Sequence, residues 1–207
     1  MNPSSCLDSL ECPECRVRLD ADQVHGLCSC GSPLLARYDL RQAARTLSYD
    51  SARGRCPGQW RWTEVLPVRD ASHQLSLGEG GTPLRPAPRL GNYLGLPRLR
   101  VKDETGNPTG SFKARGLSMA LSRSRELGIR RVAVPSAGNA ASALAAYAAA
   151  GGMDARVFLP RDVPALFPRE CRALGAEVTL VDGVISDCGR ALAEARRTED
   201  WHDVSTL

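Results

Sequence analysis

The sequence predicts an α/β protein, in which helices flank a parallel sheet and a small four-cysteine ribbon precedes that sheet. Two observations predict the sheet. From residue 78 onward, short apolar runs alternate with longer segments of helical character, and glycines mark the turns between them. The ribbon is predicted by a third observation, because four of the eight cysteines form two close pairs between residues 12 and 30.

Composition divides the chain into three parts. Residues 1–38 contain the clustered cysteines, residues 39–77 read as a connector with Trp60 and Trp62 as packing anchors, and residues 78–207 contain the alternating segments. We expect the third part to be a truncated catalytic domain, because residues 203–207 read as a strand that runs into a loop with no closing helix.

Within the third part, the pattern predicts strands and helices in regular alternation. Glycines end two of the helices, at Gly128 and at the pair Gly151-Gly152. Strands separated by helices favour parallel pairing, because each helix carries the chain back to the same edge of the sheet. The expected strands are 99–102, 131–134, 155–159 and 176–182, and the expected helices are 111–127, 139–150, 165–174 and 187–197.

Charge and hydropathy argue against several classes of protein. The chain contains no run of about 18 apolar residues, the length needed to span a bilayer. The segment MNPSSCLDSLEC lacks the features of a signal peptide. We therefore expect a cytoplasmic protein with no membrane partner. The net charge is +4, but the basic residues are scattered and aromatic residues make up only 5% of the chain. A nucleic-acid partner is therefore not expected.

The cysteine pairs have the spacing of a structural metal site. Cys12 and Cys15 form a C-x2-C pair, and Cys28 and Cys30 form a tighter C-x-C pair. Four thiolates complete a tetrahedral shell, which predicts a structural zinc ribbon that depends on its metal to fold. The alternatives are reduced surface thiols or a ribbon that has lost its metal, and His25 is a less favoured substitute ligand. Ordinary free thiols are expected at the other four cysteines, namely Cys6, Cys56, Cys171 and Cys188.

Lys113 is one of only two lysines among 27 basic residues, the other being Lys102. It lies in the first turn of a predicted helix, after a Pro-Thr-Gly turn, and the partial positive charge of a helix N-terminus disfavours protonation of an amine. A less protonated lysine is a better nucleophile toward a carbonyl carbon. In a chain that otherwise uses arginine, this lysine indicates covalent chemistry, and the alternative is a surface lysine on a helix.

Residues 136–139 lie between a predicted strand and the start of the next helix. The backbone N–H groups of such a loop, together with Ser136 and Asn139, form a cradle that suits a substrate carboxylate or a ring hydroxylate. Taken alone, the same residues are equally consistent with a turn in which Asn139 caps the helix.

Three runs together resemble the threonine synthase family, whose members are fold-type II enzymes dependent on pyridoxal phosphate. The runs are GEGGTPL at 78–84, NPTGSFKARG at 107–116 and SAGNAASALAAY at 136–147. A cysteine ribbon before the catalytic domain also occurs in part of that family. The resemblance covers nearly the whole chain and implies a tryptophan synthase beta-like sheet with flanking helices.

The resemblance also implies roles for individual residues. Lys113 forms the aldimine with pyridoxal phosphate and shuttles protons, and Asn139 bonds the ring oxygen of the cofactor. Ser111 is implied as a cofactor contact and Thr82 as a substrate contact, each either on the phosphate side or in a supporting position. Ala114 departs from the aspartate often found after the lysine in the family, which affects a local contact rather than the chemistry. The residues implied to receive the substrate carboxylate are Ser136, Ala137, Gly138 and Ala140.

Members of the family are roughly twice as long as this chain, as two domains of ordinary size require. The chain therefore resembles the amino-terminal half of a lyase that converts O-phospho-L-homoserine and water to L-threonine and phosphate, and activity of the isolated half is not expected. Its partners would be a small amino-acid substrate, a second copy in a homodimer if full length, or a separate second half. The alternatives are a serine/threonine dehydratase, a cysteate-synthase-like enzyme and a non-catalytic fragment.

Overall fold

The computed structural model describes residues 4–205 of the protein. Its first element is a three-stranded antiparallel sheet with the order β2-β1-β3. The strands are Leu7–Glu11 (β1), Arg18–Asp20 (β2) and Leu35–Tyr38 (β3). The two cysteine pairs lie in the turns that connect these strands, so the sheet presents all four cysteines at one end.

The connector is held together around one buried carboxylate. It contains two short helices, Leu40–Ala43 (α1) and Tyr49–Arg53 (α2), and a 3-10 segment at Gln59–Val65. Glu64 in this segment is fully buried and accepts two hydrogen bonds of 2.7 Å from the Arg55 guanidinium. These bonds lower the pKa of Glu64 to about 2. A buried ion pair of this kind fixes the path of the connector, because removing either partner would leave a buried charge uncompensated.

The second half of the chain forms a parallel sheet, as the alternation of strands and helices predicts. The order is β8-β7-β6-β9, and every neighbouring pair is parallel. The strands are Arg131–Pro135 (β6), Asp154–Pro160 (β7), Glu177–Val181 (β8) and His202–Asp203 (β9). The helices are Lys113–Glu126 (α4), Asn139–Gly151 (α5), Leu166–Ala173 (α6) and Ile185–Ala195 (α7).

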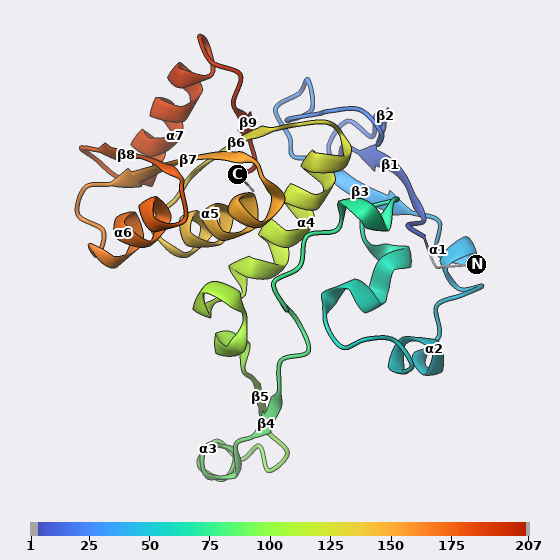
Figure 1. Ribbon diagram of the computed structural model, residues 1–207. Coiled ribbons are helices and arrows are strands. Elements are labelled where there is room, and N and C mark those ends of the chain that lie inside the picture. The colour runs from blue at the N-terminus through green and yellow to red at the C-terminus, as the bar shows by residue number, and fades with distance from the viewer. Residues whose placement is uncertain (1–3, 206–207) are drawn as a thin grey trace.

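The helices cover both faces of this sheet (Figure 1). Successive strand residues point to opposite faces, so Val132 and Val134 pack into the main core with α4, α5 and α6, whereas Ala133 packs with α7. The small side chains of α5 let this helix lie close to α4 and to the sheet, and eight consecutive residues of it, 141–148, are buried. The α/β class with a parallel sheet is confirmed. None of the helices in residues 4–205 has the length and apolar character needed to cross a membrane.

The expected strand at 99–102 lies apart from the parallel sheet. Its counterpart, Arg100–Lys102 (β5), pairs antiparallel with Leu84–Pro86 (β4), and the short helix Pro88–Tyr93 (α3) lies between them. Only 13 residues separate the two strands, so the chain folds back on itself and the strands form an antiparallel pair. Residues 84–102, which we name the arm, project from the rest of the protein (Figure 1).

Candidate active site

Lys113 is the first residue of α4 and follows a tight turn. Thr109 and Gly110 in this turn have φ values of 57° and 65°, so the backbone is left-handed at two successive residues and reverses just before the helix. Ser111 Oγ accepts a hydrogen bond of 3.3 Å from the N–H of Lys113, which satisfies one of the free donors at the helix start. The half-buried Lys113 side chain places Nζ 4.8 Å from the centre of the Phe112 ring.

The loop between β6 and α5 is organised by the Ser136 hydroxyl. This buried oxygen accepts hydrogen bonds from the N–H groups of Gly138, at 3.0 Å, and Ala141, at 3.2 Å. The N–H groups of Ala137, Asn139 and Ala140 have no hydrogen-bond acceptor among the described residues. Free N–H groups at a helix N-terminus attract an anion, so the loop has the chemistry of a carboxylate site.

One pocket brings together six of the eight residues that the sequence predicts for cofactor and substrate. Its volume is 580 Å³, within the range of about 300–1,000 Å³ that is usual for small-molecule sites. Lys113 lies in one wall, at the start of α4, and the loop 136–140 forms another wall, at the start of α5. Two segments that are far apart in the sequence therefore present an amine and an anion cradle to the same cavity.

Thr82 and Ser111 are the two predicted residues that do not line this pocket. The Thr82 hydroxyl donates to Glu104 Oε1 at 2.5 Å and accepts from Arg115 Nη2 at 3.1 Å. Arg115 also donates two hydrogen bonds to Glu104, of 2.6 and 2.9 Å, which lower the pKa of Glu104 to about 2. Since Arg115 lines the pocket, Thr82 and Glu104 together fix the position of its guanidinium group.

Asn107 joins this network to the run GEGGTPL. Its amide nitrogen donates to Glu104 Oε2 at 2.9 Å, and its Oδ1 accepts the N–H of Gly80 at 3.0 Å. Asn107 and Glu104 have no functional prediction from the sequence. The sequence carries little signal for Arg115, because arginine is abundant in this chain.

Glu79 is a second carboxylate that sequence reasoning missed. It is 1% exposed and accepts hydrogen bonds from Tyr147 Oη, at 2.6 Å, Ser118 Oγ, at 2.7 Å, and the N–H of Leu77, at 3.0 Å. Burial by itself raises the pKa of Glu79, but the bonds from Tyr147 and Ser118 outweigh burial and hold the pKa below its usual range. Glu79 thus ties the glycine-rich run to α4 and α5, the two helices that carry the pocket.

The four predicted metal ligands come together at the end of the small sheet. The Sγ atoms of Cys12, Cys15, Cys28 and Cys30 all lie within 4.8 Å of one another, with 3.5 Å between Cys12 and Cys30 and between Cys15 and Cys28. A tetrahedral zinc with Zn–S bonds of about 2.3 Å separates its sulfurs by about 3.8 Å. The donor set therefore fits zinc. His25 bonds the backbone oxygen of Asp20 at 2.8 Å and is not part of the cluster.

The pocket lies within a region that matches a known protein family. A family model described as "Pyridoxal-phosphate dependent enzyme" matches residues 75–207, which include both walls of the pocket. The chain belongs to this family of pyridoxal-phosphate dependent enzymes. A half-buried lysine amine, a neighbouring asparagine and a free N–H cradle fit the aldehyde, the ring oxygen and the amino-acid carboxylate that such an enzyme has to hold.

The curated relatives of this pyridoxal-phosphate enzyme confirm its resemblance to threonine synthase. It is 40% identical to the threonine synthase of Methanocaldococcus jannaschii, over 85% of this chain and 44% of that protein. It is 36% identical to the threonine synthase of Methanosarcina acetivorans, over 86% of this chain and again 44% of the relative. The chain thus spans less than half the length of these two relatives.

Solved structures show the same fold at lower identity. Diaminopropionate ammonia lyase from Escherichia coli, in its apo form, has a TM-score of 0.57 and 23% identity, over 64% of this chain and 42% of that chain. Maize serine racemase has a TM-score of 0.55 and 24% identity, over 61% of this chain and 38% of that chain. The expected fold-type II architecture is confirmed.

Gly138 is the position where a small substitution is expected to damage the pocket. Its φ of 152° is rare for residues with a side chain, and an added Cβ would lie 2.8 Å from the Phe167 ring. We expect Gly138→Ala to weaken pyridoxal phosphate binding, measured by absorbance titration, by about tenfold, since backbone strain alone costs about 1–3 kcal/mol. The matched control is Gly175→Ala, because Gly175 also has positive φ, 86°, but lies in open space away from the pocket. Equal effects of the two substitutions would contradict this role of Gly138.

Proposed function

We propose that the protein is the part of a threonine synthase that contains the cofactor-binding lysine and binds the substrate carboxylate. The assembled enzyme would convert O-phospho-L-homoserine and water to L-threonine and phosphate. The observation that carries the proposal is the single pocket shared by Lys113, Asn139 and the loop 136–140. The threonine synthase relatives support the choice of reaction.

In this proposal Lys113 has two functions. Its Nζ would hold the cofactor at its aldehyde group, and the same nitrogen would take the proton from the α-carbon of the substrate. Pyridoxal phosphate, when bound, supplies an electron sink that stabilises negative charge at that carbon. The turn at Thr109 and Gly110 directs the lysine toward the pocket, and the Ser111 hydroxyl keeps the helix start in place.

The loop 136–140 would orient the substrate. The N–H groups of Ala137, Asn139 and Ala140, which are free in the described chain, would receive its carboxylate. The Asn139 side chain would donate to the ring oxygen of the cofactor. The Ser136 hydroxyl would support this site as well as line it. Because it already accepts two backbone N–H groups, it shapes the loop before any ligand binds.

Reductive trapping tests the proposal. The purified chain is incubated with pyridoxal phosphate and reduced with borohydride, and the labelled peptide is then mapped. We expect label on Lys113 and none on Lys102, whose Nζ donates to the backbone oxygen of Thr82. Lys113→Ala should remove the label, whereas Lys102→Ala should not. Equal labelling of both lysines, or no label, would contradict a formed cofactor site in this chain.

The reaction itself is distinguished by its products. Release of phosphate from O-phospho-L-homoserine supports threonine synthase, whereas release of ammonia from serine or threonine supports a dehydratase. A cysteate-synthase-like enzyme would instead replace the phosphate of a phosphorylated substrate with a sulfur nucleophile.

The alternative to catalysis is a non-catalytic role in assembly. Trapping on Lys113 without turnover, even in a complex with the remainder of the fold, would favour that role.

We also propose that the ribbon holds a structural zinc and that the protein acts in the cytoplasm. Four thiolates leave no open position on a tetrahedral ion, so the metal would stabilise the ribbon and take no part in the reaction. All eight cysteines are free in the structure, which suits a reducing compartment.

A further inference from the structure

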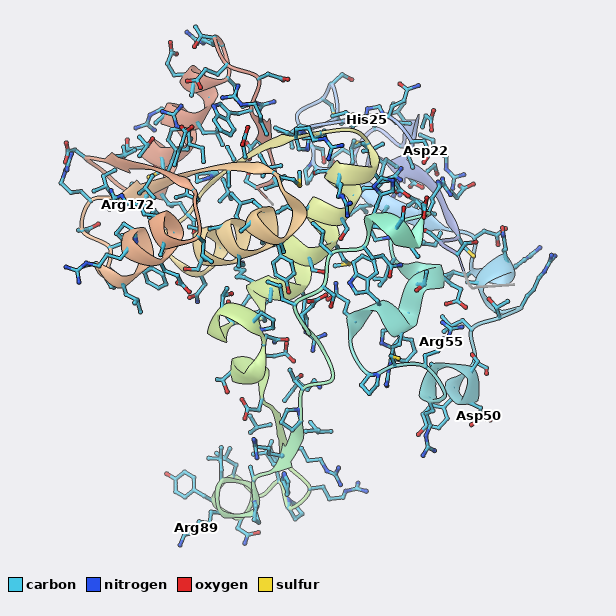
Figure 2. All side chains as sticks on the ribbon, in the orientation of Figure 1. Asp22, His25, Asp50, Arg55, Arg89 and Arg172 are labelled. Carbon is cyan, nitrogen blue, oxygen red and sulfur yellow. The ribbon has the colours of Figure 1, made fainter. Side chains whose placement is uncertain are left out.

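A second pocket, of 490 Å³, lies between the connector and the run GEGGTPL. Its volume is within the range of about 300–1,000 Å³ that is usual for small-molecule sites. The connector contributes Arg55, which is labelled in Figure 2, and Trp60, and the glycine-rich run contributes Gly78 and Glu79. This pocket shares no lining residue with the pocket of Lys113, so it is a separate cavity with no part in the proposed reaction.

Close contacts of the backbone hold the walls of this second pocket. The N–H of Gln59 donates to the backbone oxygen of Glu79 at 3.0 Å, and Gln59 Nε2 donates to the backbone oxygen of Arg115 at 2.9 Å. A Cβ added at Gly80 would lie only 2.6 Å from the backbone nitrogen of Gln59, so the connector and the glycine-rich run touch closely there. The fold itself therefore forms the pocket, and no ligand is needed to shape it.

Arg61 is the charged group of this pocket that lacks a partner. Its Nε atom is buried and has no hydrogen-bond acceptor in residues 4–205. The other arginine of the pocket, Arg55, donates instead to both carboxylate oxygens of Glu64. Glu79 also lines the pocket, but its carboxylate is held by the hydroxyl groups described above. A buried donor on a charged group is costly without an acceptor, so Arg61 calls for an anion.

Two backbone N–H groups of the pocket are free as well. Cys56 and Gly58 both line it, and the N–H of neither residue has an acceptor in the part of the chain that the structure describes. A guanidinium group and backbone N–H groups are donors only, so together they suit a group with two or more acceptor oxygens, such as a carboxylate or a phosphate. The half-buried Trp60 offers an apolar surface beside these donors.

We propose that this pocket is a second ligand site, which binds a small organic anion through the guanidinium group of Arg61. The carboxylate or phosphate of the ligand accepts hydrogen bonds from Arg61 Nε and from the N–H groups of Cys56 and Gly58, and its apolar part packs against Trp60. Gln59 bonds both the glycine-rich run and α4, so the ligand lies beside the residue that joins this pocket to the active-site helix. The inference does not require the proposed reaction.

Anion titrations followed by nuclear magnetic resonance test the inference. The isotope-labelled chain is titrated with inorganic phosphate and, separately, with succinate, while chloride keeps the ionic strength constant. We expect saturable shifts of the N–H signals of Cys56, Gly58 and the Trp60 indole, and the anion with the lower Kd identifies the preferred charged group. Arg61→Gln should weaken binding at least about tenfold. Arg61→Lys keeps the charge but loses the planar fork, and should weaken binding at least about threefold.

Arg53→Gln is the matched control. Arg53 also belongs to the connector, but it is exposed, lies over the Tyr49 ring and does not line the pocket, so this variant should keep the affinity. Circular dichroism should be the same for all the variants. The inference would be overturned if no shift were saturable, if the shifts persisted unchanged in Arg61→Gln, or if they were confined to the loop 136–140. Since no cofactor is present, these outcomes are separate from those of the trapping experiment.

Discussion

Replacing Glu79 with alanine is expected to lower the free energy of unfolding by about 3–5 kcal/mol, because four donors would lose this acceptor. These donors are the hydroxyl groups of Tyr147, Ser118 and Ser76 and the N–H of Leu77. Urea denaturation followed by circular dichroism measures the change. Trapping of pyridoxal phosphate on Lys113 should also fall, since Ser118 and Tyr147 belong to the two helices that form the pocket.

The control for this prediction is an exposed glutamate. Glu194 is 69% exposed and pairs with Arg197 on the surface, so Glu194→Ala should cost less than about 1 kcal/mol. Tyr147→Phe should cost less in the Glu79→Ala background than in the wild type, because the two groups share one hydrogen bond. A loss for Glu79→Ala no larger than that for Glu194→Ala would contradict the structural role of Glu79.

Removing metal from the ribbon is the second large effect that we expect. The three short strands β1, β2 and β3 bury little apolar surface, so the free energy that orders them has to come from the metal, at about 10–16 kcal/mol for a structural zinc site. The purified chain should contain one zinc ion, and chelation or Cys12→Ser should remove the hydrogen-exchange protection of residues 7–38.

Cys56→Ser is the matched control for the ribbon. Cys56 is exposed and lies outside the cluster, so this variant should keep both the zinc and the protection. Protection that persists in the metal-free ribbon would show that packing alone holds it, and would contradict the structural role of zinc.

The core elements were predictable because local signals fix them. The expected helix 139–150 is observed at Asn139–Gly151, and the expected strand 131–134 at Arg131–Pro135. Continuous apolar runs and terminal glycines define such elements within a few residues. The pairing of β5 with β4 was not predictable in the same way, since its residues, Arg100, Val101 and Lys102, look like those of any short strand. Pairing depends on where the chain turns back, which is not a local property.

In the site, too, some features follow from local sequence and others depend on the fold. Motifs identify Lys113 and the loop 136–140, and the structure places them in one pocket, although their roles stay predictions. Sequence does not distinguish a buried carboxylate such as Glu79 or Glu104 from a solvated one, because the distinction depends on which donors the fold brings near. The contact between Thr82 and Arg115 could not be predicted from the sequence either, because 33 positions of the chain separate the two residues.

The two ends of α4 lie in different parts of the protein. In its last turn, Arg123 donates hydrogen bonds to the backbone oxygen of Ala21 and to the carboxylate of Asp22. Asp22, which is labelled in Figure 2, lies in the ribbon segment, as does Ala21. The first residue of α4 is Lys113. The helix has 14 residues and is a stiff rod about 21 Å long, so a tilt of about 3° at the ribbon would displace the lysine by about 1 Å. A displacement of that size can cost a reaction about a hundredfold in rate. The ribbon thus anchors the end of α4 opposite Lys113, and its rigidity determines where the lysine amine lies in the pocket.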